Sequence, residues 1–321
     1  RAGPLPAAPD GGRAPSASLD GTIRMWDLST GDARRTIQYA ATAVAFGAQP
    51  HELVAGSDDG AVTLFDLETG TVARTFSGCV SRVSSVGMAL GRFVLARAGG
   101  GTVVWDLEGS PSPRIEMDEP DADSSFVPQG TMAILPGSGR VASAGDKTLR
   151  VWDVKTGETV FTASRESFGY DQLAALPDGR SVIYACLMDV LDVVDTGTGQ
   201  VCLELPQTAM RVASLAVSPD GRRAVTASNS GQVRVWDLHG RPPGRVALRH
   251  TRWVGAGASA DGGRYAVSVS LDGALMWNLG TGEVAHTFDV DWSLKPFRHT
   301  FLTQVPGPWR WTVGPLPAAG I

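Results

Sequence analysis

The chain has 321 residues, 43% of them hydrophobic, which is enough for two average domains or for one large all-β domain with a packed core. Its formal charge of −5 and isoelectric point of about 5.6 argue against a general nucleic-acid binder, which would normally carry a basic face. Three cysteines cannot form a complete set of disulfides, which favours a reducing, cytoplasmic setting. No apolar run approaches the roughly 18 to 20 residues of a transmembrane helix, so we expect no membrane insertion.

A short motif, most often Trp-Asp, returns along the whole chain. In chain order its copies are Trp26-Asp27, Phe65-Asp66, Trp105-Asp106, Trp152-Asp153, Val194-Asp195, Trp236-Asp237 and Trp277-Asn278. Subtracting neighbouring positions gives spacings of 39, 40, 47, 42, 42 and 41 residues. A period near 40 indicates repeating units that bury their faces against one another.

Each repeat is predicted to consist of short β-strands separated by turns. In the sixth repeat the alternation of apolar and polar residues predicts strands over 214–217, 224–228 and 233–236. Pro-Asp-Gly turns at 177–179 and 219–221 separate first and second strands, and Thr-Gly pairs precede last strands. No segment shows a clear helical periodicity, so we expect little helix.

The motif, its period and its turns resemble the WD-repeat family, whose unit is one four-stranded blade of a β-propeller. The resemblance implies an all-β fold, with a seven-bladed propeller of four-stranded antiparallel blades over 1–288 and an extra tail over 289–321. Such arrays also occur in NACHT-type signalling proteins, so we expect this chain to be part of a larger one. The blades are expected to end one strand beyond Trp26, Phe65, Trp105, Trp152, Val194, Trp236 and Trp277.

The two ends of the chain share the six residues GPLPAA, at 3–8 and 314–319. In repeat register the first copy is the first strand of blade one. The second copy follows a complete seventh blade, and two interpretations stay open. The preferred one is a linker and the start of a further repeat, and the other is a tail strapped across blades one and seven.

In the family, a buried chain of hydrogen bonds joins the Trp to a Ser or Thr, a His and an Asp. This network is structural, although its Ser, His and Asp could be mistaken for a hydrolase triad. The blades other than one and seven depart further from this pattern, so we expect them to be stabilised mainly by apolar packing. The resemblance places the network most completely at His250, Ser268, Asp272 and Trp277 in blade seven, and in part at Ser16, Asp20 and Trp26 in blade one.

Catalytic and metal-binding patterns are missing from the sequence. Its five histidines have no metal-ligand spacing, and its three cysteines have no CxxC spacing. The glycine run 99–101 lacks the Gly-Lys-Ser/Thr of a phosphate-binding loop and is interpreted as a turn. We therefore expect no catalytic residue, metal or cofactor.

Partner binding is the function that the resemblance implies, through the end of the propeller built by loops before the first strand and between the second and third strands. Arg and Trp are common at the energetic centres of interfaces. An acidic segment at 116–123, in the longest gap between repeats, is either a solvated loop or a contact for a basic partner. The candidate contact residues are Arg82, Arg211, Arg252, Trp253, Asp58 and Asn229.

The preferred function is therefore a non-catalytic scaffold or sensing module that binds a protein or peptide. The first alternative is a propeller enzyme with a hydrolase-like site in its central channel, which would need acid and base side chains on the inner strands. The second is phosphoinositide recognition by paired arginines, for which the candidates are Arg34-Arg35 and Arg222-Arg223.

Overall fold

The computed structural model describes residues 13–17, 21–27, 33–99, 101–108, 114–117, 132–144, 148–164, 170–186, 190–206, 212–218, 220–228, 230–239, 245–249, 254–260, 265–270, 273–278, 281 and 283–288. Within these ranges the regular structure is entirely β-strand, and no helix occurs. The prediction of an all-β fold is confirmed for this part of the chain.

Seven antiparallel sheets follow one another along the chain, each made of consecutive strands. Six have four strands and the first has three. Sheets one to three contain β1 (Arg13–Ala17), β2 (Thr22–Asp27) and β3 (Ala33–Gln38), then β4 (Ala41–Phe46), β5 (Glu52–Ser57), β6 (Val62–Asp66) and β7 (Val72–Phe76), then β8 (Val83–Ala89), β9 (Phe93–Ala98), β10 (Gly101–Asp106) and β11 (Arg114–Met117).

The remaining four sheets repeat the same order from first to fourth strand. Sheets four and five contain β12 (Met132–Leu135), β13 (Arg140–Ala144), β14 (Thr148–Asp153) and β15 (Thr159–Ser164), then β16 (Tyr170–Ala175), β17 (Ser181–Cys186), β18 (Val190–Asp195) and β19 (Val201–Pro206). Sheets six and seven contain β20 (Val212–Val217), β21 (Arg223–Ser228), β22 (Gln232–Asp237) and β23 (Arg245–Arg249), then β24 (Val254–Ala260), β25 (Tyr265–Ser270), β26 (Gly273–Asn278) and β27 (Val284–Phe288).

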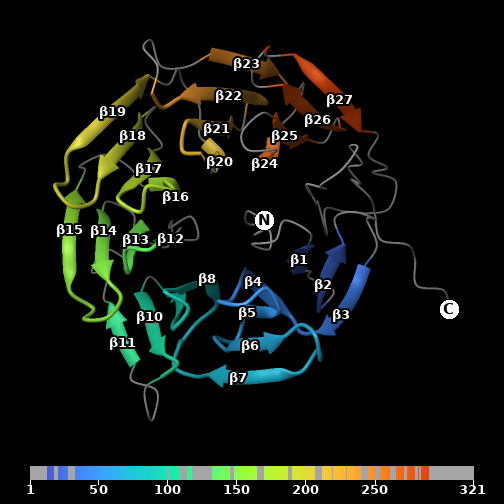
Figure 1. The fold of residues 1–321 in the computed structure, drawn as a ribbon, viewed down its shortest axis with the longest axis vertical. Helices are drawn as coiled ribbons and strands as arrows, with labels where there is room; N and C mark the ends of the chain where they lie inside the picture. The colour runs from blue at the N-terminus through green and yellow to red at the C-terminus, as the bar shows by residue number, and fades with distance from the viewer. Residues whose placement is uncertain are drawn as a thin grey trace.

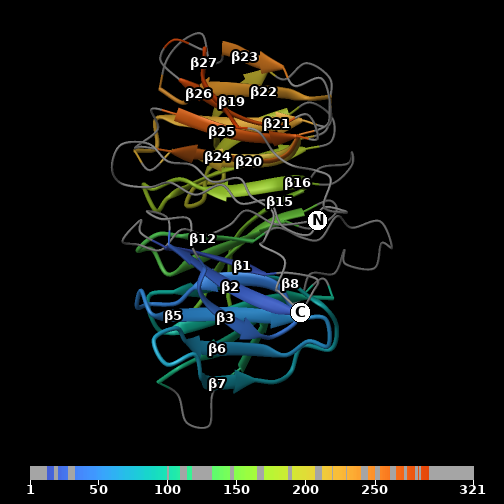
Figure 2. The same ribbon diagram turned by 90° about the vertical axis from the view of Figure 1, so that its right-hand side faces the viewer.

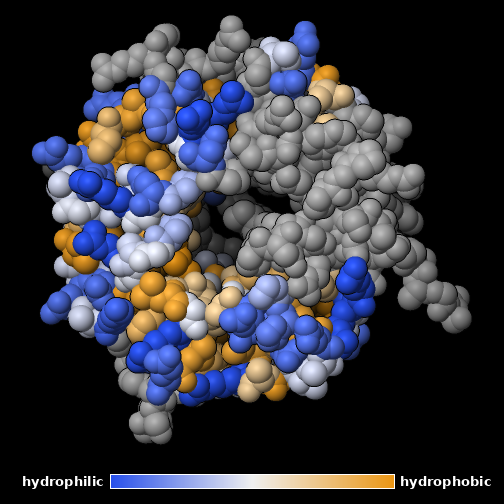
Figure 3. Space-filling view, in the orientation of Figure 1, coloured by the Kyte–Doolittle hydropathy of each residue, from blue (hydrophilic) through white to orange (hydrophobic). Residues whose placement is uncertain are grey.

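The sheets succeed one another around a central space, with the first strand of each four-stranded sheet nearest the centre and the fourth at the outside (Figure 1). Viewed from the side, neighbouring sheets are stacked face to face (Figure 2). The space-filling view shows a hollow at the centre of the ring and hydrophilic side chains along much of the described outer rim (Figure 3). Because consecutive strands are antiparallel, the loops that join them lie at the two ends of the ring, where contacts with other molecules are possible.

The core consists of apolar layers between successive sheets. One cluster joins Val54 and Leu64 of sheet two to Val94 and Trp105 of sheet three, and the other clusters pair the sheets in the same way. A single sheet of this size cannot bury both faces by itself, so each depends on its neighbours for stability.

The Asp of the Trp-Asp motif holds the turn between third and fourth strands. Asp153 Oδ1 accepts hydrogen bonds from the backbone N–H groups of Lys155 at 2.8 Å and Thr156 at 3.2 Å. Asp195 Oδ1 accepts the equivalent bonds from Gly197 and Thr198 at 2.8 and 2.9 Å. The carboxylate therefore satisfies turn donors, a role that the sequence analysis did not assign.

A register shift of one residue recurs between third and fourth strands, next to the motif in five sheets and at Val233/Arg234 in sheet six. It falls at Val151/Trp152 in sheet four, and sheets one, two, five, six and seven have a shift in the same pair of strands. The described pairing of β10 with β11 in sheet three has none. Such shifts are typical of β-bulges, which increase the local twist of the outer strand.

The first sheet differs from the four-stranded expectation, because only three strands are described there. The predicted first strand, Gly3–Ala8, lies outside the described residues, as does the tail at 289–321 with its second copy of GPLPAA. Both interpretations of that tail stay predictions. The predicted Pro-Asp-Gly turns are present, with Gly179 and Gly221 at φ of 65° and 69°, which a glycine adopts without strain.

Candidate interaction face

The candidate site lies at the end of the sheets where second strands turn into third strands. In antiparallel order, this end also receives the loops that lead into each first strand. The turn between β5 and β6 packs here against the loop that precedes β8. Gly60, at φ of 89°, allows this approach, because an added Cβ would lie 2.5 Å from the Cys79 carbonyl oxygen. We call residues 58–60 and 79–82 the loop face.

Two of the predicted contact residues meet on the loop face. Arg82 Nη1 lies 3.0 Å from Asp58 Oδ1, and the side chains are 44% and 66% exposed. An ion pair this exposed contributes only about 0.2–1 kcal/mol to stability, because water screens it. The pair presents both charges to solvent and leaves part of each side chain available to a partner.

Val80 lies in the same loop and is 94% exposed. The sequence analysis missed it, since a single valine in a loop has no periodicity to mark it. The sequence signal that could have identified Val80 as a contact residue is its position between Cys79 and Arg82. A fully exposed valine beside two charges has the composition of a small interface centre with a polar rim.

The turn that contains Asp58 carries a second carboxylate, Asp59, which accepts two hydrogen bonds. The Ser57 hydroxyl donates a hydrogen bond to Asp59, and the Ala61 N–H donates another to Asp59 Oδ1 at 3.1 Å. These two donors lower the pKa of the Asp59 carboxyl, although desolvation raises it. Asp59 therefore keeps its charge well into acidic solution.

In three sheets the motif Trp is bonded to a buried hydroxyl on the second strand. Trp277 Nε1 donates to Ser268 Oγ at 2.7 Å, which brings together two members of the network expected in blade seven. The other two bonds run from Trp152 to Ser143 at 2.8 Å and from Trp236 to Thr226 at 2.9 Å. These pairs are buried and structural.

In the two sheets where Val194 or Phe65 stands in place of the motif Trp, a tyrosine hydroxyl takes part in a side-chain hydrogen bond. In sheet five, the Tyr184 hydroxyl donates to Asp192 Oδ2 at 2.9 Å, and both residues are buried. In sheet two, the Tyr39 hydroxyl accepts a bond from Thr63 Oγ1 at 3.2 Å, and its ring packs edge-on against Phe65. The sequence analysis assigned neither tyrosine a role, because their partners depend on the register between strands.

Several predicted residues lie outside the described part of the chain. The side chains of Ser16 and Trp26 are not described, although their backbones are part of β1 and β2. Their roles stay predictions. The others outside the described residues are Arg211, Asn229, Arg252 and Trp253 of the predicted contact set, and Asp20, His250 and Asp272 of the predicted network.

No group of three or more His, Cys, Asp or Glu side chains in the described ranges is arranged to hold a metal ion. Across the same ranges, no helix has the length and apolar character of a membrane span.

The family model described as "WD domain, G-beta repeat" matches residues 124–153 and 200–237. Both matches end at a Trp-Asp pair whose Trp bonds a buried hydroxyl, Trp152 and Trp236. The chain therefore contains WD repeats in an all-β, propeller-like fold, and this supports its resemblance to the WD-repeat family.

The chain is also similar to Protein groucho of Drosophila melanogaster, with 26% identity over 172 residues. That match covers 51% of this chain and 22% of the relative, so the chain spans about a fifth of the relative's length. The repeats and this similarity together support a protein-interaction scaffold.

Proposed function

We propose that the chain is a non-catalytic protein-interaction module, a seven-bladed propeller over 1–288 that binds a protein partner through its loop face. The observation that carries this proposal is Val80, 94% exposed in the same loop as the Arg82–Asp58 ion pair. An apolar side chain so exposed gains by burial against a partner, and the charges beside it orient that partner.

By sequence register, Arg211, Asn229, Arg252 and Trp253 are expected at equivalent positions in later repeats, so we include them in the proposed face. The free thiols of Cys79 and Cys202 fit the reducing, cytoplasmic setting that we propose. The WD repeats and the similarity to Protein groucho favour binding over catalysis.

The test is affinity capture from cell extract with wild type, Val80→Asp and Arg82→Glu, followed by mass spectrometry. The matched control is Val72→Asp, which changes a valine that is 54% exposed on β7. We expect the captured proteins to fall at least about tenfold with the loop-face variants and to stay unchanged with the control.

Equal capture by all four proteins would show that the loop face is not the binding surface. A Trp253→Ala, Arg211→Ala double variant extends the test to the later repeats. If that variant binds normally while Val80→Asp does not, the interface is confined to sheets two and three.

A further inference from the structure

A row of short turns borders the central space at the end of the ring opposite the loop face. Each of these turns joins a first strand to a second strand, and the first strands lie nearest the centre (Figure 1). In sheets two to five the turns cover residues 47–51, 90–92, 136–139 and 176–180. We call these four turns the turn row.

The four turns are in contact with one another. A Cβ added to Gly91 would lie 3.3 Å from the Ala48 Cβ, and one added to Gly139 would lie 3.1 Å from Leu90 Cδ1. In sheet five, a Cβ added to the glycine of the Pro-Asp-Gly turn would meet the Pro136 carbonyl oxygen. The turn row is therefore one continuous surface across four sheets.

Apolar side chains are exposed along the turn row. Leu90 is 46% exposed. Ala48, Pro136 and Pro177 are exposed in the other three turns. Apolar side chains that face solvent together on one continuous surface are typical of an interaction site, whereas single scattered ones are ordinary.

The backbone of Leu90 has a conformation that disfavours leucine. Its φ is 53° and that of Gly91 is 66°, as in type I′ turns, where Asn-Gly is the preferred pair. The Arg92 N–H closes the turn with a bond to the Ala89 carbonyl oxygen at 3.1 Å. A bulky residue at positive φ is a true outlier, and such strain is concentrated at functional sites. The turn itself does not require the apolar side chain, which argues that this side chain contacts another molecule.

An acidic side chain follows the last proline of the turn row. Asp178 is exposed, and its Oδ1 accepts hydrogen bonds from the backbone N–H groups of Arg180 and Ser181, both at 2.8 Å. Desolvation raises the pKa of this carboxyl, but the hydrogen bonds outweigh it and the pKa lies below its ordinary value. Asp178 is therefore charged at neutral pH.

The arginines of the turn row are engaged in ion pairs. Arg92 pairs with Asp106, and Arg180 pairs with Asp195. Asp178 forms no ion pair with any residue in the described ranges. The turn row thus presents an uncompensated negative charge beside its apolar part.

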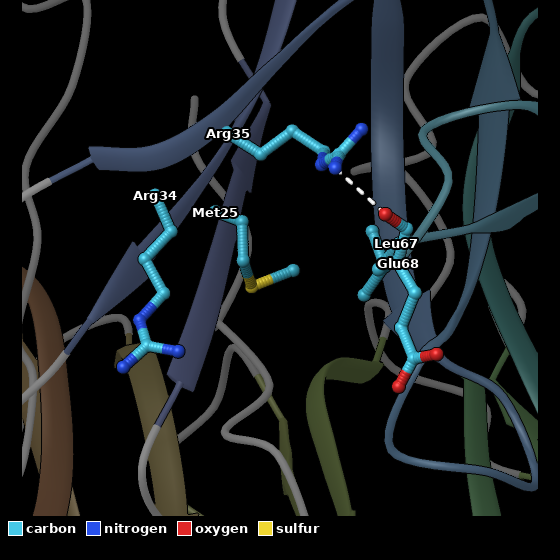
Figure 4. Close-up of a pocket in the computed structure, with 5 residues that line it drawn as sticks. All are labelled: Met25, Arg34, Arg35, Leu67 and Glu68. Carbon is cyan, nitrogen blue, oxygen red and sulfur yellow. Dashed lines mark hydrogen bonds between the residues drawn. The ribbon is translucent and has the colours of Figure 1, made fainter.

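The outer part of this end, between sheets one and two, is taken up by contacts between the sheets. Arg35 Nη2 donates to the Glu68 carbonyl oxygen at 2.7 Å, and its Nη1 donates to the Thr69 carbonyl oxygen at 2.8 Å (Figure 4). Met25 and Leu67, which line the groove there, are only 4% and 6% exposed. That groove offers a ligand little apolar surface, so we place the site on the turn row.

We propose that the turn row binds an extended segment of a partner protein in which apolar side chains are followed by a basic one. The apolar side chains cover Leu90 and Pro136, and the basic side chain lies against Asp178. Charge complementarity selects this occupant, because the charge left uncompensated beside the apolar surface is negative. The site is at the other end of the ring from the loop face, so the two can be tested separately.

The test uses the full 321-residue chain and three fluorescein-labelled peptides, measured by fluorescence polarisation. GLSLSGKSG carries both features, GLSLSGESG reverses the charge, and GSSSSGKSG lacks the apolar side chains. Wild type should bind the first peptide about fivefold more tightly than either of the others, since each mismatch removes one of the two contacts.

Two variants separate the contacts from the fold. Leu90→Asn removes the apolar side chain and should weaken binding of GLSLSGKSG about fivefold, while the urea midpoint stays the same or rises because asparagine suits the turn. The matched control is Val201→Asn, which changes a valine that is 43% exposed on β19 and should bind as wild type does. Asp178→Asn keeps an oxygen acceptor for the turn and should bind GLSLSGKSG and GLSLSGESG equally. Circular dichroism checks that each variant is folded.

Equal affinity of wild type for the three peptides, or no binding at millimolar concentration, would overturn the proposal. Wild-type affinity in folded Leu90→Asn, or an unchanged charge preference in Asp178→Asn, would do the same. Val80→Asp should bind the peptide normally, and loss of binding there would move the segment to the loop face. Loss of captured proteins in Val80→Asp, with peptide binding intact, bears only on the loop face.

Discussion

Replacing Ser143 by alanine should measure how much the buried Trp–hydroxyl bond contributes to stability. Ser143 is 0% exposed and Trp152 is 5% exposed, and Oγ lies 2.8 Å from Nε1. The variant leaves the indole N–H buried without this acceptor, which costs about 1–3 kcal/mol, while the small loss of volume adds little. Urea unfolding followed by tryptophan fluorescence gives the difference in the free energy of unfolding.

Sheet three supplies the matched control, because Ala96 lies two residues beyond the cross-strand partner of Trp105, as Ser143 lies two residues beyond the partner of Trp152. The register pairs Trp105 with Val94 and Trp152 with Val141, so Ala96 and Ser143 are equivalent. Ala96→Ser offers the missing acceptor and should leave stability unchanged or raise it by up to about 1 kcal/mol. A Ser143→Ala protein within about 0.3 kcal/mol of wild type, or a strongly destabilised Ala96→Ser protein, would refute this reasoning.

Two further predictions concern buried and surface carboxylates. Tyr184→Phe removes a hydrogen-bond donor from buried Asp192 and should lower the free energy of unfolding by about 1.5–3 kcal/mol, measured by urea unfolding. An unchanged urea midpoint would show that this hydrogen bond does not contribute to stability. Asp59 and Asp220 have lowered pKa values, caused first by a serine hydroxyl and then by a backbone N–H. Their folded pKa values lie below the unfolded value of about 3.9, so the stability they add is present above that pH and is lost as the pH falls through the folded values. Urea midpoints from pH 6 to pH 2.5 should therefore fall less in an Asp59→Asn, Asp220→Asn variant than in wild type.

The sequence was sufficient to predict the repeating β architecture, because each repeat carries its own strand and turn signals. The position of Trp277 at the end of a third strand follows from the period of the motif, and its bond to Ser268 is what the resemblance to the WD-repeat family implies. These features depend on local spacing, which a single sequence displays directly.

Contacts that depend on the pairing of strands or sheets, such as the one between Tyr184 and Asp192, could not be predicted in the same way. Tyr184 and Asp192 are eight residues apart, and only the pairing of β17 with β18 places them side by side. The Arg35 contact joins residues more than 30 positions apart, and nothing in either segment alone indicates it. The exposure of Val80 likewise depends on how the loop packs over Gly60.

The register shifts beside the motif have a consequence for association between copies of the chain. Every sheet ends in an outer strand whose free edge could template further pairing, as in aggregation. In six of the seven sheets the outer strand pairs with a register shift, five of them next to the motif, and the added twist makes these edges poor partners for a flat, continuous strand. β11 of sheet three shows no such shift in its described pairing with β10. The described edge of sheet three therefore lacks the protection that curvature gives to the other six.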